Sequence, residues 1–169
     1  MLIKSADSTF QLTILGYEHP DAAGEPYDAN WLSIQVDAAG PDGAWTGSDP
    51  CLLTYEAVRL ADWLGAVADG KTAARAISFL EPVLLFRLID GPRGRTLRVH
   101  FGNLINPSWK MLDPGAQRKD TSNGSKAVER SPAAAHDLYL DFPLSEADLR
   151  RASQELRDAM RRYPDRAEM

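Results

Sequence analysis

Carboxylates are the most abundant chemically active side chains in the first third of the chain. Between Lys4 and Arg59 the sequence holds nine acids and no base: Asp7, Glu18, Asp21, Glu25, Asp28, Asp37, Asp42, Asp49 and Glu56. Aromatic side chains lie among them, including Tyr17, Tyr27, Trp31 and Trp45. Aromatic anchors inside a charged rim are typical of the energetic centre of a protein–protein interface. This pattern indicates a surface that binds a basic partner.

The run from Asp28 to Leu32 also has a purely structural interpretation. Asp28 and Asn30 can bond their own backbone and shape a turn, while Trp31 covers the edge of a sheet. Acidic residues can equally serve solubility alone. The sequence leaves both interpretations open.

The sequence lacks the residue spacings that a metal site or a catalytic nucleophile needs. No histidine has a partner at H-x-H or H-E-x-x-H spacing; the three are His19, His100 and His136. The single cysteine, Cys51, has acidic and apolar neighbours, which raise the pKa of a thiol, so we expect a small buried residue there. We therefore expect no metal, no cofactor and no catalytic residue.

Composition bounds the class of protein. The chain has 169 residues, of which 44% are hydrophobic and 25% charged, with a net charge of −5. These values predict one globular domain over residues 1–169. A lone cysteine excludes an intramolecular disulfide and fits a reducing cytoplasm. Apolar runs such as Val83–Phe86 are too short to span a membrane, and no apolar signal segment follows Lys4, so a cytoplasmic protein without membrane attachment is expected.

Positive charge is concentrated in residues 70–112, which hold seven bases and two acids. Such a concentration suggests nucleic-acid binding, because phosphate contacts supply most of that affinity. Residues 1–69, however, hold eleven acids and two bases, and this charge opposes approach to a polyanion. We therefore predict no nucleic-acid binding and expect the arginines to pair with the acidic N-terminal strands. They include Arg87, Arg93, Arg95 and Arg98.

Alternating apolar residues predict the strands that must position these side chains. The expected strands are Thr9–Gly16, Trp31–Asp37, a short one over Ala44–Asp49, Val83–Asp90, Arg95–Gly102 and His136–Phe142. Ile77–Leu80 is a short strand or a bend. Glycine and proline predict hairpin turns at residues 40–43 and 91–94.

Two amphipathic helices are also predicted. Thr54 can cap the first, whose apolar positions follow helical spacing until Gly70. Ser145 and Asp148 form a capping box at the start of the second, which Pro164 ends. The class is α+β: one antiparallel curled sheet of six or seven strands with both helices packed on it. A β-sandwich with appended helices is the alternative, and polar residues 113–135 are expected to be a mobile loop.

Four segments together resemble the WapI-type immunity family of bacterial polymorphic toxins. They are Ile14–Glu18 (ILGYE), Tyr27–Ile34 (YDANWLSI), Leu52–Thr54 (LLT) and Phe79–Pro82 (FLEP). The resemblance implies a small bacterial protein that protects its producer by binding the cognate toxin domain. It supplies no catalytic residues.

The leading hypothesis is therefore a non-enzymatic immunity protein that occludes a basic toxin domain and is itself a monomer or weak homodimer. The partner-binding candidates are Tyr17, Glu18, Asp21, Glu25, Tyr27, Asp28, Trp31, Asp42 and Trp45. One alternative is a small-ligand or regulatory domain that binds its ligand between sheet and helices. Another is a hydrolase in which His100 and His136 converge near Asp137 or Asp141.

Overall fold

Two four-stranded antiparallel sheets and two helices make up the computed structural model. It describes residues 1–22, 27–72, 74–92, 94–102, 105, 107, 138–143 and 145–166. One sheet has the order β1 (Leu2–Lys4), β2 (Thr9–Tyr17), β3 (Trp31–Gly40) and β4 (Gly43–Leu53), and the other has the order β5 (Ala76–Ser78), β6 (Leu84–Gly91), β7 (Gly94–Phe101) and β8 (Leu138–Pro143). The helices are α1 (Thr54–Ala68), α3 (Glu146–Met160) and the short 3₁₀ helix η1 (Asp28–Asn30). The loop predicted over residues 113–135 lies outside the described residues.

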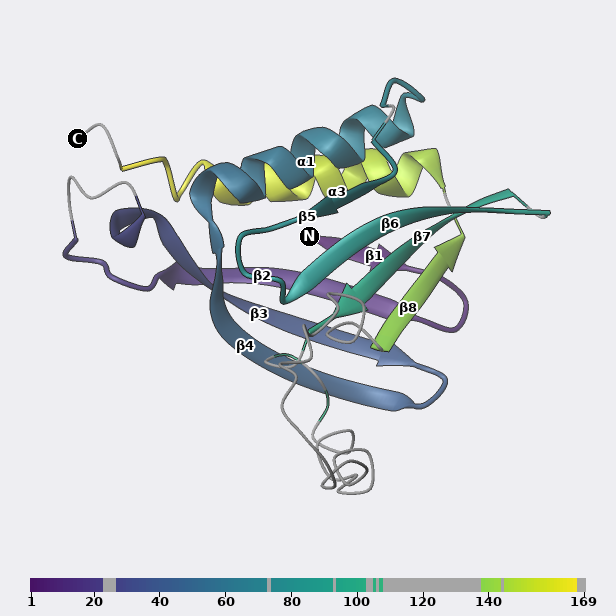
Figure 1. Ribbon diagram of the computed structural model, residues 1–169, viewed down its shortest axis with the longest axis horizontal. Helices are drawn as coiled ribbons and strands as arrows, with labels where there is room; N and C mark the ends of the chain where they lie inside the picture. The colour runs from purple at the N-terminus through teal and green to yellow at the C-terminus, as the bar shows by residue number, and fades with distance from the viewer. Residues whose placement is uncertain are drawn as a thin grey trace, which may run out of the picture.

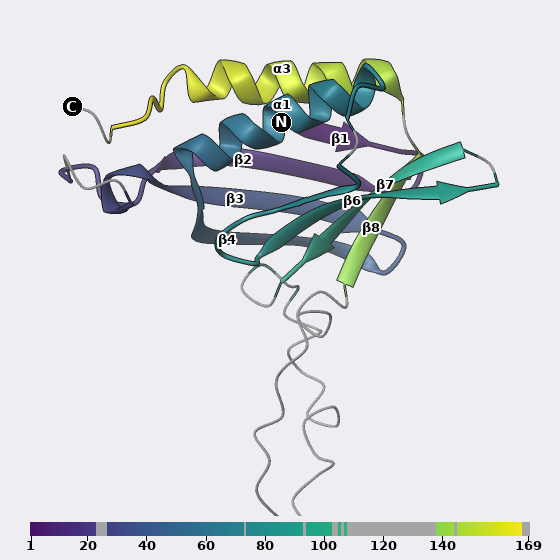
Figure 2. The same ribbon diagram turned by 45° about the horizontal axis from the view of Figure 1, so that its top comes forward.

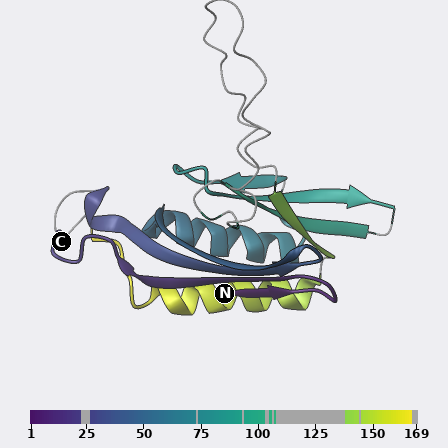
Figure 3. The same ribbon diagram turned by 90° about the horizontal axis from the view of Figure 1, so that it is seen from below.

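The α+β class with antiparallel strands and two helices is confirmed, whereas a single sheet of six or seven strands is not. The chain leaves β4 directly into α1 and begins a second sheet at β5, so β4 and β5 are not neighbours. Each sheet has one apolar face that must be buried. Figures 1 and 2 show the two helices side by side along one side of both sheets. Figure 3 shows the first sheet lying between α3 and the second sheet.

Aromatic contacts join the two sheets at the centre of one continuous core. The ring of Phe10 on β2 lies 5.6 Å from that of Phe86 on β6, edge to face, and 5.9 Å from that of Phe101 on β7. All three side chains are completely buried. Such pairs contribute both apolar burial and favourable ring geometry.

The predicted hairpins are confirmed, and β4 is longer than expected. Gly43 and Gly94 close the two turns with positive φ angles of 135° and 113°. Pairing along β3 continues from the Gly40–Gly43 pair to the Trp31–Leu53 pair, so β4 has 11 residues. Pairing with β3 thus overrides the weak strand propensity of glycine and proline in β4, with one register shift beside Pro50. The three-residue strand β1 was not predicted, because it is too short to show alternation.

The first helix begins one residue earlier than predicted and is capped differently. Leu53, not Thr54, occupies the N-cap position, and the Glu56 carboxylate accepts a hydrogen bond from the Leu53 amide at 3.2 Å. The Thr54 hydroxyl donates instead to the buried side-chain oxygen of Asn30 at 3.1 Å. Gly70 follows the helix with a φ of +67°, as the predicted stop requires.

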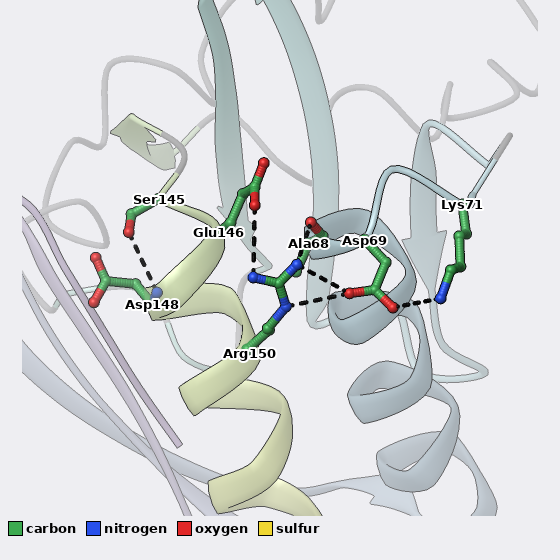
Figure 4. Close-up of polar contacts among 7 residues, drawn as sticks. All are labelled: Ala68, Asp69, Lys71, Ser145, Glu146, Asp148 and Arg150. Atoms are coloured by element: carbon green, nitrogen blue, oxygen red, sulfur yellow. Dashed lines mark hydrogen bonds and ion pairs between the residues drawn. The ribbon is translucent and has the colours of Figure 1, made fainter.

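Ser145 caps α3 as predicted, accepting from the Asp148 amide at 3.3 Å. Figure 4 shows how Arg150 then links this helix to the end of α1. Its guanidinium donates to the Asp69 carboxylate at 3.1 Å and to the Ala68 carbonyl at 3.3 Å. Hydrogen bonds from Lys71, followed by those from Arg150, lower the pKa of Asp69. A cation at the carboxyl end of α1 also complements the helix dipole.

Neither of the two long helices that the structure describes is long and apolar enough to cross a membrane.

Replacing Phe10 with alanine should destabilise the fold by about 3–5 kcal/mol, because it removes the ring that joins the two sheets and leaves a cavity. Chemical denaturation monitored by tryptophan fluorescence measures this change. Leu15→Ala, on the same strand but exposed, is the matched control and should change stability by less than about 0.5 kcal/mol. Equal effects from both variants would contradict the position of Phe10 at the centre of the core.

Candidate functional site

The predicted partner-binding residues separate into two groups at opposite ends of β3. Those near its start lie on β2, on η1, in the connection between them and at the first residue of β3: Tyr17, Glu18, Asp21, Tyr27, Asp28 and Trp31. Asp42 and Trp45 lie at the β3–β4 hairpin, at the other end of the strand (Figure 1). Ten strand residues separate the groups by on the order of 30 Å. Glu25 lies outside the described residues. The candidate residues therefore do not form a single continuous patch.

The Trp45 side chain packs against β7 of the second sheet and the segment after it. Its ring lies edge to face against Phe101 at 5.1 Å, and its indole nitrogen donates to the Ile105 carbonyl at 3.0 Å. Asp42 is exposed at the hairpin turn. This end of the sheet thus offers an exposed carboxylate beside a half-buried tryptophan.

Exposed apolar side chains gather near the start of β3. Tyr27 and Leu80 are each 58% exposed, and Tyr55 and Val58, one helical turn apart on α1, are each 43% exposed. Tyr27 lies close enough to Tyr55 to influence its ionisation. These four exposed side chains come from three separate segments. Thr54, before Tyr55, bonds Asn30 near Tyr27, and Glu56, after Tyr55, bonds the Leu80 amide.

A buried carboxylate fixes the relative positions of these segments. Glu56, next to Tyr55, is 2% exposed and accepts hydrogen bonds from the amides of Leu53 and Leu80, the latter at 2.8 Å. Arg59 adds a bond from its guanidinium to the Ser78 carbonyl at 2.7 Å. Together these bonds hold the connection between β5 and β6 against the first turns of α1.

Carboxylates border the exposed apolar group. Burial raises the pKa of Asp49, and repulsion from Glu81 and then Glu18 raises it further, so these three acids lie close together. Asp28 is exposed on η1 beside Tyr27. We call the combined set the acidic–aromatic surface: Tyr27, Tyr55, Val58 and Leu80 with Glu18, Asp28, Asp49 and Glu81.

The sequence predicts three of these eight residues as partner-binding candidates, Glu18, Tyr27 and Asp28, and places Asp49 only among the clustered acids. Tyr55, Val58, Leu80 and Glu81 were missed as site residues. A signal existed for Tyr55 and Val58, because both lie off the apolar stripe of α1 and so cannot share its buried face.

Tyr17 and Asn30 support the acidic–aromatic surface through contacts with the C-terminal segment. The Tyr17 hydroxyl donates to the Pro164 carbonyl, and its ring lies 5.6 Å from that of Tyr163. Asn30 is buried at the end of the 3₁₀ turn η1, and its side chain bonds Thr54 and the C-terminal segment. Burial raises the pKa of Tyr17, partly opposed by Arg166.

Cys51 is buried, as expected. Burial, together with Asp49 and other nearby acids, raises the pKa of its thiol to about 12. A thiolate nucleophile is therefore not available at this position near neutral pH.

Arg95 and Arg98 pair with acids of the second sheet, as does Arg75 just before it, and not with the N-terminal strands; Arg93 lies outside the described residues. Arg75 and Arg95 contact Asp90, and Arg98 makes two hydrogen bonds to Asp141, at 2.7 and 2.8 Å. The acids of their own sheet lie closer across the strand register, so Asp141, opposite Arg98, becomes its partner. The acidic N-terminal segment therefore keeps much of its uncompensated charge.

The hydrolase alternative involves two residues, His136 and Asp137, that lie outside the described residues. The His100 ring faces the Tyr139 ring at 5.6 Å, and Asp141 is engaged by Arg98. Within the described ranges no three potential metal ligands meet.

A groove of about 940 Å³ lies between the β3–β4 hairpin and β8. Its lining includes Asp42, Trp45, Tyr139 and Asp141. It is therefore formed between the two sheets, not between sheet and helices as the small-ligand alternative predicts.

The model of the Immunity protein WapI-like family matches residues 1–164 of the chain. The chain belongs to the WapI-like immunity protein family. Membership indicates a toxin-neutralising immunity protein whose partner is a toxin protein, and immunity proteins of this kind are typically non-enzymatic. No curated protein sequence matches this WapI-like chain.

Asp49→Asn should stabilise the free protein by on the order of 0.5 kcal/mol at pH 7. The pKa of Asp49 is higher in the folded than in the unfolded chain, so folding is penalised when the carboxylate is charged. The penalty is full above the folded-state pKa and disappears below the unfolded-state value. Denaturation of both proteins from pH 7 to pH 3.5 should show the gain vanish as pH falls. A gain that is constant with pH, or a loss of stability at pH 7, would contradict this placement.

Proposed function

We propose that this WapI-like protein neutralises its toxin by covering a basic functional face of the toxin with the acidic–aromatic surface. The observation that carries the proposal is that exposed Tyr27 and Tyr55 lie near each other, with Asp28 next to Tyr27 and the acids Asp49, Glu81 and Glu18 on neighbouring segments. A centre of exposed aromatics within a charged rim is the usual arrangement of a strong interface.

Charge gives the surface its partner preference. Its four carboxylates outnumber the neighbouring bases Arg59 and Arg166. The Arg59 guanidinium is already bonded to the Ser78 carbonyl, and that of Arg166 to the carbonyls of His19, Pro20 and Ala29. An excess of negative charge accelerates association with a basic protein and disfavours nucleic acid. The mutual repulsion around Asp49 is relieved when a lysine or arginine of the toxin approaches. The same acids that destabilise the free protein therefore favour the complex.

The tyrosines supply the apolar contact. Tyr27 and Tyr55 each present a large ring with few rotatable bonds, so that little conformational entropy is lost when they are buried. Glu56 and Asn30 hold the backbone beneath them through buried hydrogen bonds. A surface organised before binding loses less free energy on association.

The mechanism requires binding alone. We infer that the protein acts in the cytoplasm, as a monomer or weak homodimer, without enzymatic activity, cofactor, nucleic acid or membrane. The toxin needs only to be sterically occluded for the producer to be protected.

Tyr55→Ala should weaken binding to the toxin about 30-fold, the loss of roughly 2 kcal/mol expected for a central aromatic anchor. The probe is the catalytically inactivated C-terminal domain of the toxin encoded directly upstream, measured by surface plasmon resonance. Asp28→Lys should slow association and flatten its dependence on salt.

Matched controls come from the opposite end of the first sheet and from the second sheet. Tyr139 is 44% exposed, like Tyr55, and Asp42 is exposed, like Asp28. Tyr139→Ala and Asp42→Lys should leave binding within about two-fold of native. If the controls weaken binding and the acidic–aromatic variants do not, the proposed surface is wrong.

The groove between the sheets supports one second candidate, a small-ligand site lined by Trp45 and Tyr139. Its volume is in the range of small-molecule pockets. A thermal-shift screen with a metabolite panel tests it: a reproducible rise in melting temperature that Tyr139→Ala abolishes would favour this function over toxin binding.

A further inference from the structure

The segment after α3 lies across the connection between β2 and β3 (Figures 1 and 3). Tyr163 and Pro164 contact Tyr17 at the end of β2. The Asn30 amide donates to the Asp165 carboxylate at 2.8 Å at the start of β3. Residues distant in sequence thus meet next to the short segment that carries Tyr27 and Asp28 of the acidic–aromatic surface.

Arg166 makes the most extensive of these contacts. Its guanidinium donates to the carbonyls of His19 and Pro20, each at 2.8 Å, on one side of the connection. It also donates through Nε to the Ala29 carbonyl at 2.8 Å, on the other side. The same group lies 3.6 Å above the centre of the Tyr17 ring. One side chain therefore joins both ends of the connection that carries part of the surface.

The backbone of Arg166 adds to this arrangement, since its amide donates to the Asn30 side-chain oxygen at 2.9 Å. Asn30 is in turn bonded to Thr54, the residue before Tyr55. The contacts of residue 166 thereby couple η1 to the start of α1. Arg166 lies beyond the 1–164 segment that the family model matches.

We propose that Arg166 is a positioning residue for toxin recognition. It holds the β2–β3 connection so that Tyr27 and Asp28 face the toxin together with Tyr55. This proposal rests on the proposed function of the surface. Only arginine fits the role, because its planar group offers five donors in a fixed fork, whereas lysine offers one compact charge.

Positioning and charge make opposite predictions for Arg166. Its positive charge lies next to an acidic surface, so removing it makes the surface more negative and should speed association with a basic toxin. Loss of positioning instead leaves the binding arrangement only partly populated, which lowers the apparent association rate. Arg166→Lys and Arg166→Gln separate the two effects, since only the second removes the charge.

The free protein gives the first test. Amide hydrogen exchange should be about ten-fold faster at Glu18 and Asn30 in both variants, because their hydrogen bonds to Trp31 and Tyr27 lie within the connection. Arg162→Gln removes a nearby exposed charge and should leave these amides unchanged. Thermal melts show whether either variant unfolds globally. If Arg166→Gln does, the exchange rates of Arg166→Lys are compared with those of the native protein. Native exchange rates in a folded Arg166→Lys variant would overturn the proposal.

Association with the same inactivated toxin domain gives the second test. Both Arg166 variants should associate about three- to ten-fold more slowly, with dissociation rates near native. Faster association of Arg166→Gln with unchanged Arg166→Lys would show that only charge matters and would overturn the proposal. If native protein does not bind the toxin, or if Tyr55→Ala binds as native does, the proposed function fails. The exchange result still decides whether Arg166 orders the connection.

Discussion

A single buried amide ties together three segments that are far apart in the sequence. Asn30 is 1% exposed, and its side-chain oxygen accepts from the Thr54 hydroxyl at 3.1 Å and from the Arg166 amide at 2.9 Å. Its nitrogen donates to Asp165 at 2.8 Å. A buried amide without partners is strongly unfavourable, so the start of β3, the start of α1 and the C-terminal segment must meet at this point. Tyr27 precedes this junction and Tyr55 follows it, and the acidic–aromatic surface forms around it.

The surface combines rigid support with local electrostatic repulsion. Glu56 and Asn30 are buried and hydrogen-bonded, whereas burial raises the pKa of Asp49 and repulsion from Glu81 and then Glu18 raises it further. Repulsion of this kind lowers the stability of the free protein but is relieved by a basic partner. Binding sites commonly sacrifice stability in this way. The core offsets this loss of stability. Phe10 on the first sheet packs against Phe86 and Phe101 on the second, and these contacts are present without the toxin.

Sequence reasoning succeeded where structure follows from local signals and failed where it depends on distant contacts. The Ser145 cap of α3 and the apolar stripe of α1 involve neighbouring residues, and both helices were predicted. Division into two sheets depends instead on where α1 directs the chain after Leu53. Within the site, Glu18 and Tyr27 belong to one local pattern. Leu80 joins them only because its amide reaches Glu56, a contact that no local spacing reveals.

The position of the toxin on the molecule is the central claim, and amide hydrogen exchange of the complex measures it most directly. Binding of the inactivated toxin domain should slow exchange in residues 27–31, 54–59 and 78–81, which carry or support the acidic–aromatic surface. Exchange in residues 40–43 and 138–143, around the groove between the sheets, should stay as in the free protein. Protection confined to the groove, with unchanged exchange at residues 27–31 and 54–59, would contradict the account.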